Sequence, residues 1–321
     1  MWEILFWLLV FVGGYFTIFF AADVFLDNLK DLCLIFNLSP FIIGLLVLGI
    51  DPEESIASII AAINGLPFIA VGNVIGNSIF SLSLCFALAA FFYRIELKAI
   101  SKFYFLILYA CMIAIIFSFT FQFGLFIFGI ITLILYLLYI FKSLKDVSKK
   151  GTVEVVEIDE IIEEREKFEF GKVSKFKKVV WVLLSLLFII LGGELLIFSA
   201  ENIINLTNIA EEFFGFIIIA FVTNVEELTL IFKSIKKKSI EIGLGGMIGK
   251  VIWNLSLTYG ISAIIAINIQ FLLILILNWI ILLVLIIFFQ FKAYKKEMGK
   301  PDAIFLAIIL VIFLIINLLS I

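Results

Sequence analysis

The sequence contains no histidine, only three cysteines and only four prolines. Histidine is the usual catalytic base near neutral pH and the commonest transition-metal ligand, so its absence removes both from consideration. Cys33, Cys85 and Cys111 lie in or beside apolar segments and show no Cys-x-x-Cys spacing. This pattern indicates neither a zinc site nor a disulfide framework, and we expect the three side chains to pack as small apolar groups. No resident cofactor is expected.

Charged residues are scarce as well. They make up 15% of the 321 residues, whereas hydrophobic residues make up 64% and the mean hydropathy is +1.27. A soluble globular domain is nearer one half apolar, so the composition excludes that class and indicates a polytopic membrane protein. The expected partners are therefore the lipid bilayer and small solutes, with no nucleic acid, and the oligomeric state stays open.

Long apolar runs predict ten membrane helices, because a helix needs about 20 apolar residues to cross a bilayer. The runs do not alternate in polarity as the strands of a membrane barrel would. The predicted fold is all-α. The spans are expected at residues 2–22, 40–63, 67–92, 103–121, 123–142, 179–200, 213–234, 240–267, 270–291 and 302–320.

Basic residues predict the orientation of these spans. Of the 23 Lys and Arg residues, 22 lie in five connecting segments, and the exception is Lys250. Since cytoplasmic loops carry an excess of Lys and Arg, we expect these segments to face the cytoplasm and both termini to lie outside the cell membrane. The segments are 23–39, 93–102, 142–178, 233–239 and 292–300.

The two halves of the chain repeat each other. Glu54 precedes Gly72 by eighteen residues, and Glu227 precedes Gly245 by the same interval. Each half has five predicted spans, an odd number, so the second half enters the membrane with opposite polarity. Inverted repeats of this kind place a transport site near the bilayer midplane, where the halves meet. The expected units are a first repeat at 1–142, a cytoplasmic linker at 143–178 and a second repeat at 179–321.

Carboxylates lie inside two of the predicted spans. Glu226 and Glu227 are adjacent in the stretch from Phe214 to Asn254, and an Asp-Pro-Glu-Glu run occupies 51–54. Acidic groups at membrane depth are costly, so a functional role is the default interpretation. The proline frees a backbone carbonyl, which is tolerated in a membrane where that backbone lines a cavity or binds an ion.

Neutral oxygen donors accompany these acids. Thr223 and Asn224 directly precede the second acidic pair, and an oxygen-only set suits hard cations such as Ca²⁺ or Na⁺. Asn73, Asn77 and Ser81 recur every four residues and so share one helix face. Asn254 is an equivalent residue in the second half. Two interpretations remain open for these: hydrogen bonds between helices, at about 0.6 kcal/mol each, or cation binding.

These motifs resemble the α-repeats of the calcium:cation antiporter superfamily, which includes the sodium/calcium exchangers. Each family repeat carries G-T-S-x-P-E followed by G-N-x-I-G-S. Here the first repeat reads GIDPEE at 49–54 and GNVIGN at 72–77, and the second reads VTNVEE at 222–227 and GGMIGK at 245–250. The resemblance covers nearly the whole chain. It implies a secondary antiporter that exchanges Ca²⁺ against Na⁺ or H⁺ by alternating access.

Carried over position by position, the resemblance implies that Glu54 and Glu227 are the central ion-binding carboxylates. The chain departs from the family pattern where Ile50 and Asp51 replace Thr and Ser, and where Lys250 replaces a small hydroxyl residue. The further candidate ligands are Asp51, Glu53, Thr223, Asn224, Glu226, Asn77, Ser81 and Asn254.

Lys250 lies some ten residues into its span, on the turn expected to face Glu227. At about 4 Å and an effective dielectric near 20, an ammonium attracts a carboxylate by about 4 kcal/mol. Our hypothesis is that Lys250 is a tethered cation that occupies one ion subsite, so that fewer free cations bind and coupling involves protons instead of, or beside, sodium. The alternative is that Lys250 only packs.

Two other function classes share parts of this pattern. A Glu-Glu pair in a membrane helix also resembles the motif of glutamate-type prenyl-protein proteases, but those sites need histidines, so we do not expect an enzyme. A protein that keeps the fold with altered selectivity, or without transport as a scaffold or partner subunit, remains the alternative. The acidic segment within 142–178 lacks an Asp-x-Asp-x-Asp-Gly calcium loop and is expected to be a linker.

Overall fold

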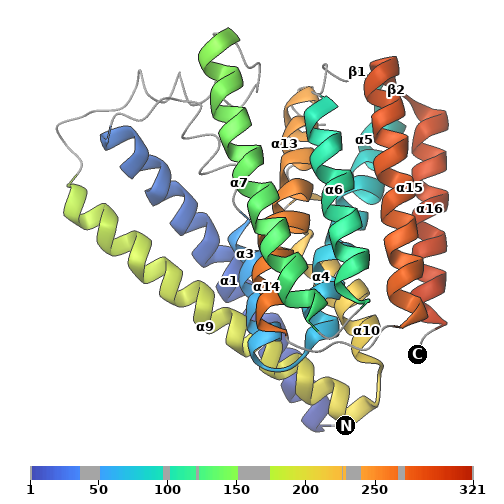
Figure 1. Cartoon of the computed structure of the whole chain (residues 1–321). Helices are drawn as coiled ribbons and strands as arrows, with labels where there is room; N and C mark the ends of the chain where they lie inside the picture. Colours follow the sequence, from blue (N-terminus) through green and yellow to red (C-terminus); the bar gives the residue numbers. More distant parts are fainter. Residues whose placement is uncertain are drawn as a thin grey trace.

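The computed structural model describes residues 2–36, 51–96, 102–120, 123–150, 174–225, 227–228, 240–266 and 272–319. These residues are almost entirely helical, as the apolar runs predict (Figure 1). The first half contains α1 (Trp2–Ile35), α3 (Pro52–Ile63), α4 (Pro67–Phe80), the π-helical turn η2 (Ser81–Cys85), α5 (Phe86–Phe92), α6 (Lys102–Ser118) and α7 (Gly124–Lys150). The second half contains α9 (Lys175–Thr207), α10 (Glu211–Phe213), the π-helical turn η3 (Phe214–Ile219), α11 (Ala220–Thr223), α13 (Ile240–Trp253), the π-helical turn η4 (Asn254–Thr258), α14 (Tyr259–Ile265), α15 (Leu273–Lys295) and α16 (Lys300–Leu318).

Seven helical stretches in the described part of the chain are long and apolar enough to cross a membrane. Three helices run further than their predicted spans: α1 ends at Ile35, α9 extends from Lys175 to Thr207, and α7 continues to Lys150. The predicted ends at 22, 200 and 142 are therefore wrong as helix ends. Hydropathy measures only the apolar length of a helix, whereas the hydrogen-bonded backbone continues into polar sequence.

Helices α1 and α9 lie side by side along one flank of the molecule (Figure 1). A side chain added at Gly14 would meet the backbone of Leu196 and Gly192, so the two helices touch backbone to backbone there. At their other ends Lys178 forms an ion pair with Asp31 at 2.6 Å. The pair thus joins the first helices of the two halves.

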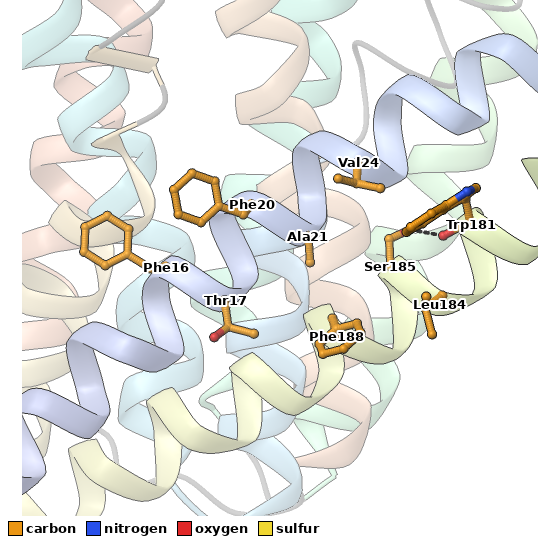
Figure 2. A pocket seen from close by; sticks show the side chains of 9 residues that line it. All are labelled: Phe16, Thr17, Phe20, Ala21, Val24, Trp181, Leu184, Ser185 and Phe188. Atoms are coloured by element: carbon orange, nitrogen blue, oxygen red, sulfur yellow. Dashed lines mark hydrogen bonds between the residues drawn. The ribbon is translucent and has the colours of Figure 1, made fainter.

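A groove of ≈ 340 Å³ opens between these two helices (Figure 2). Its walls are aromatic and aliphatic, and its two hydroxyl groups bond to their own helices: Thr17 donates to the Gly13 carbonyl, and Ser185 donates to the Trp181 carbonyl. The groove therefore offers an apolar surface and no donor set for a cation. Its lining residues are Phe16, Thr17, Phe20, Ala21, Val24, Trp181, Leu184, Ser185 and Phe188.

The halves meet where α4 crosses η3. Side chains added at Gly72 or Gly76 would overlap the backbone of Phe216, so the two helices approach each other closely at these two glycines. Gly249 has a different environment, because among the described residues the nearest atom to an added side chain there is the Tyr139 hydroxyl at 3.5 Å. There a side chain, and no helix backbone, fills the space that the missing Cβ leaves.

The π-helical turns η2 and η4 occupy equivalent places in the two halves. Their sequences are Ser-Leu-Ser-Leu-Cys and Asn-Leu-Ser-Leu-Thr, and they begin at positions 81 and 254, which are 173 residues apart. The same offset separates Glu54 from Glu227 and Asn77 from Lys250. Each turn directly follows a site helix, α4 or α13.

Two short strands depart from the expected all-helical arrangement. Strand β1 (Ile95–Glu96) pairs antiparallel with β2 (Glu297–Met298), with Ile95 opposite Met298. Arg94 forms an exposed ion pair with Glu297 beside them. The contact joins a loop of the first half to a loop of the second half.

Candidate cation-binding site

The first acidic run begins helix α3. Asp51 is the N-cap residue, and its Oδ1 accepts a hydrogen bond from the Glu54 amide at 3.2 Å. Pro52 stands at the first helical position, where its missing N–H is not needed. The proline therefore starts a helix, whereas the sequence suggested a freed carbonyl inside one; residues 37–50 lie outside the described part. Glu54 falls in the first turn, where the helix dipole favours a negative charge.

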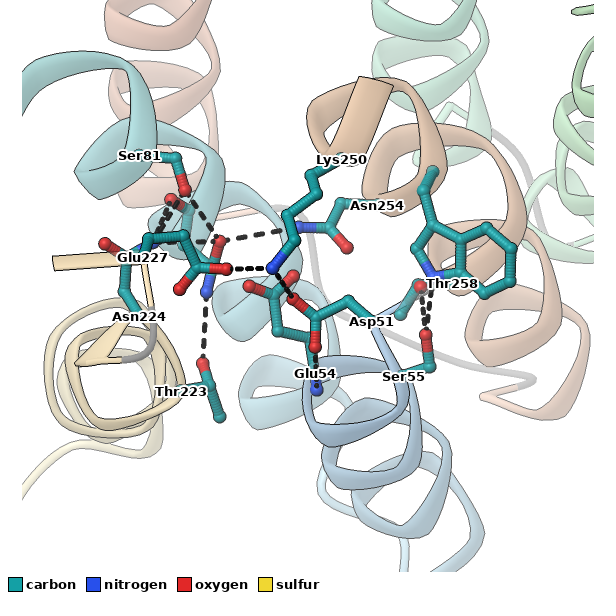
Figure 3. Close-up of polar contacts among 12 residues, drawn as sticks. Asp51, Glu54, Ser55, Ser81, Thr223, Asn224, Glu227, Lys250, Asn254 and Thr258 are labelled. Atoms are coloured by element: carbon teal, nitrogen blue, oxygen red, sulfur yellow. Dashed lines mark hydrogen bonds and ion pairs between the residues drawn. The ribbon is translucent and has the colours of Figure 1, made fainter. Parts of the chain in front are cut away.

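Three carboxylates from the two halves converge (Figure 3). One oxygen from each of Asp51, Glu54 and Glu227 lies within 4.8 Å of the others. Each of the three residues is at most 2% exposed. Like charges held this close in a buried place repel one another, and positive charge nearby offsets that repulsion.

Lys250 supplies part of that positive charge. Its Nζ lies 3.1 Å from Oδ2 of Asp51 and forms an ion pair with Oε1 of Glu227 (Figure 3). The lysine comes from α13 in the second half and so joins that half to the N-cap of α3 in the first. The structure thus places Lys250 at the carboxylates, as its position in the predicted span suggested.

Glu54 is arranged differently from the other two carboxylates. Among the described residues, neither of its carboxylate oxygens has a well-formed hydrogen bond, and neither does Oδ1 of Asn254. The side-chain amide of Asn254 lies next to the Glu54 carboxylate. Buried acceptors without donors are costly, and a bound cation removes that cost.

A network of amides and hydroxyls lies beside the carboxylates, with Asn77 at its centre. Asn77 Nδ2 donates to Oγ1 of Thr223 at 3.2 Å. Oδ1 of Asn77 accepts from Ser81 at 3.2 Å, Asn224 at 3.3 Å and Asn254 at 3.4 Å. The structure therefore joins the predicted neutral ligands chiefly to one another across the two halves.

Asn73 follows the same pattern. Its Nδ2 donates to Ser58 Oγ at 2.8 Å and to the backbone carbonyl of Glu54 at 3.2 Å. For the asparagines on α4, the structure thus shows the hydrogen bonds between helices that the spacing left open. Glu53 is 2% exposed but is not among the carboxylates that converge, and Glu226 lies outside the described residues.

A second cross-half cluster was not anticipated from the sequence. Ser55 Oγ and Thr258 Oγ1 share a hydrogen bond of 2.7 Å, and Trp253 Nε1 donates to Ser55 Oγ at 2.8 Å. Trp253 packs edge-on against Tyr136. The sequence does contain a signal for Thr258. The Leu-Ser-Leu repeat of the two π-helical turns aligns Thr258 with Cys85, whose Sγ donates to Oδ1 of Asn224 in the amide network.

Comparison with protein families gives a match over most of the chain. Residues 6–145 and 177–319 match the sodium/calcium exchanger protein family in two segments. The segments correspond to the two halves and leave out the connection between them. The chain is also 25% identical to the uncharacterized membrane protein MJ0091 of Methanocaldococcus jannaschii over 247 residues, which are 74% of this chain and 75% of that protein.

Solved structures of the sodium-calcium exchanger NCX_Mj have the same fold. One, soaked with 2.5 mM Na⁺ and 10 mM Sr²⁺, is 21% identical, covers 96% of this chain and 98% of its own, and gives a TM-score of 0.59. Another, soaked with 10 mM Na⁺ without Ca²⁺, is also 21% identical, covers 99% and 98%, and gives 0.59. This likeness establishes the fold: an all-helical membrane protein of ten helices in two repeats. Together with the family match, it shows that the chain belongs to the sodium/calcium exchanger protein family, and is an ion transporter and not an enzyme.

Proposed function

We propose that the protein is a secondary active antiporter that exchanges Ca²⁺ against Na⁺ or H⁺ by alternating access. The observation that carries this proposal is the convergence of Asp51, Glu54 and Glu227, three buried carboxylates, where the two halves meet. Carboxylate and amide oxygens are the donors that hard cations prefer. Repeats of opposite polarity can rock against each other about a site that both of them build.

The proposal gives the site residues two roles. Glu54, Glu227 and Asp51 would bind the cation directly, with Oδ1 of Asn254 as a neutral donor. The hydrogen-bonded residues beside them would hold the helices in place and lend oxygens when the halves move. These are Asn77, Ser81, Thr223 and Asn224. Glu53 and Glu226, each next to a central glutamate, would have smaller effects because neighbours on a helix point about 100° apart.

Counter-transport in proteoliposomes tests the proposal. Vesicles loaded with Na⁺, with K⁺ or at acidic internal pH are diluted into medium with labelled Ca²⁺, and uptake is followed. We expect an outward Na⁺ or H⁺ gradient to drive uptake, and the same gradient to fail with Glu54→Gln protein. If no gradient drives uptake and the purified protein shows no saturable Ca²⁺ binding by calorimetry, the scaffold alternative replaces the antiporter.

The orientation in the cell membrane is part of the proposal. Both termini would lie outside and the 143–178 linker would face the cytoplasm, following the basic residues. A cysteine introduced at Ser148 should stay unlabelled by an impermeant thiol reagent in intact cells, whereas one at the exposed Asn64 should react. The three native cysteines are buried and give a low background. Labelling of the cysteine at position 148 would show that the linker faces outside and that the proposed orientation is wrong.

A further inference from the structure

Lys250 sits between carboxylates of both halves instead of reaching the surface. Its two partners, Asp51 and Glu227, have side chains that are 1% exposed, and its own side chain is 14% exposed. A lysine that snorkels would direct its ammonium toward water and away from buried acids. The ammonium of Lys250 is therefore a component of the charged site.

The fold does not require a charge at this position. The equivalent residue of the first half is Asn77, which forms neutral hydrogen bonds with Thr223, Asn224 and Asn254. A neutral residue thus suffices to pack one copy of the helix. The ammonium in the other copy changes the electrostatics of the site.

The charges that face one another can be counted. Among the described residues, three carboxylates converge and one ammonium contacts two of them, so this group carries two net negative charges when all three acids are ionised. Glu53, although buried, is not in the converging group. An uncompensated buried charge opposes any step that seals the site from water, so the halves should reorient readily only when the bound cations bring two positive charges.

We propose that Lys250 is a fixed counter-cation that sets the exchange at one divalent cation against two monovalent cations, so that a full cycle moves no net charge. This inference rests on the proposed antiport and specifies its stoichiometry. One Ca²⁺ neutralises the site on the way in, and two Na⁺ or H⁺ neutralise it on the way back. Without the ammonium, three monovalent cations neutralise the three carboxylates on the way back, whereas one Ca²⁺ leaves one negative charge uncompensated on the way in. The Ca²⁺ step should then be slower, and each cycle moves one positive charge.

The test compares Ca²⁺ accumulation at imposed membrane potentials. Proteoliposomes exchange Ca²⁺ for whichever of Na⁺ or H⁺ drives uptake, and a K⁺ gradient with valinomycin sets the potential. For the wild type we expect the equilibrium Ca²⁺ ratio to stay constant as the potential changes. For Lys250→Met we expect an inside-positive potential to raise accumulation, by tenfold for every 60 mV or so, since one charge moves per cycle.

Two further variants separate charge from packing. Lys250→Arg keeps the positive charge and should remain independent of the potential. The double variant Lys250→Met with Asp51→Asn again leaves two net negative charges, so it should lose the voltage dependence that Lys250→Met gains. A voltage dependence in the wild type, or its absence in Lys250→Met, would overturn the proposal. The wild-type prediction can be tested even if a variant fails to fold.

Ca²⁺ self-exchange distinguishes this inference from the proposed function. Exchange of labelled for unlabelled Ca²⁺ needs no counter-ion and moves no charge, so its rate reports only that the site binds and reorients. If the wild type shows Ca²⁺ self-exchange and its net exchange depends on voltage, the proposed role of Lys250 is refuted and the antiporter proposal stands. Absence of both self-exchange and driven uptake in the wild type would refute the antiporter itself.

Discussion

The two copies of the site helix differ in one residue that decides their chemistry. On α4, Asn77 belongs to a neutral network that joins Thr223, Asn224 and Asn254. On α13, the equivalent Lys250 forms ion pairs with Asp51 and Glu227. One copy thus joins the halves by neutral hydrogen bonds, and the other adjusts the charge of the site.

The two arrangements also respond differently to damage. Hydrogen bonds between membrane helices contribute about 0.6 kcal/mol each on average, so the network of Asn77 has several small contributions. A buried ion pair contributes little when intact, but removal of one partner leaves an uncompensated charge. Loss of Lys250 should therefore be felt more strongly than loss of Asn77.

The largest effect is expected from Lys250→Met. Removing the ammonium leaves Asp51 and Glu227 uncompensated, which should lower the stability of the detergent-solubilised protein by about 3–5 kcal/mol without bound Ca²⁺. Thermal unfolding monitored by circular dichroism measures the change. Saturating Ca²⁺ should restore part of the loss, because the cation supplies the missing positive charge.

A double variant serves as the control for that prediction. Combining Lys250→Met with Asp51→Asn removes both partners of one ion pair, and the loss of stability should be smaller than for Lys250→Met alone. Equal losses in the single and double variants would mean that the lysine contributes by packing, and the comparison with Asn77 would then concern shape and not charge.

Next in size is the effect of Glu54→Gln or Glu227→Gln on cation binding. Each change keeps the shape of the side chain but removes a charge and a strong acceptor, so Ca²⁺ affinity should fall about 10- to 100-fold. Calorimetric titration of purified protein measures it. Glu53→Gln is the matched control, since that residue is equally buried but does not converge with the others. Unchanged affinity in Glu227→Gln would remove Glu227 from the site.

Asn77→Ala should have a smaller effect than Lys250→Met. It deletes the amide to which Thr223, Asn224 and Asn254 are bonded, and unmet buried groups cost about 1–3 kcal/mol. Thermal stability measures the change. Asn202→Ala is the control, because among the described residues that amide bonds to the Phe198 carbonyl of its own helix, at an exposed site. If the two variants lose equal stability, the network around Asn77 has no special role.

The smallest effect concerns the start of α4. No side chain of its own N-cap, Leu66, caps the helix, and Glu211 of the other half accepts from the amides of Phe68 at 2.8 Å and Ile69 at 3.2 Å. Burial raises the pKa of Glu211, which lies ahead of its membrane span, above the ordinary value of 4.5. The folded protein therefore binds this proton more tightly than the unfolded chain does.

It follows that the contribution of Glu211 to stability is fully present below the ordinary pKa and is lost as the pH rises through the raised value. In Glu211→Gln, the amide oxygen still accepts from the helix, and this part of the pH dependence should disappear. Melting temperatures measured from acidic to neutral pH would show it. A pH profile identical to the wild type would mean that other groups dominate the titration.

The sequence was sufficient for the all-helical membrane fold, its two repeats and the meeting of Glu54, Glu227 and Lys250. Lipid exposure demands apolar runs of fixed length, and a polar residue inside such a run must face the protein interior. For that reason the few charged residues within the spans locate the site without any knowledge of packing.

Other features could not be predicted from the sequence for physical reasons. The partners of Asn77 depend on side-chain directions across three helices, which spacing along one helix does not specify. The Tyr139 hydroxyl beside Gly249 comes from a helix more than a hundred residues away in the sequence. The extension of α1 beyond its apolar part is supported by contacts with α9, such as the Asp31–Lys178 ion pair, which hydropathy does not register.

The π-helical turns η2 and η4 also have a consequence for the phase of the helices that contain them. A π turn holds about one residue more than an α turn, so the helix beyond it is rotated by about 100° relative to an uninterrupted α-helix. Residues such as Asn77 and Lys250 before the turn, and the apolar faces of α5 and α14 after it, can therefore both point inward. A deletion of one residue within either turn would restore a continuous α-helix and direct one of these two faces toward lipid.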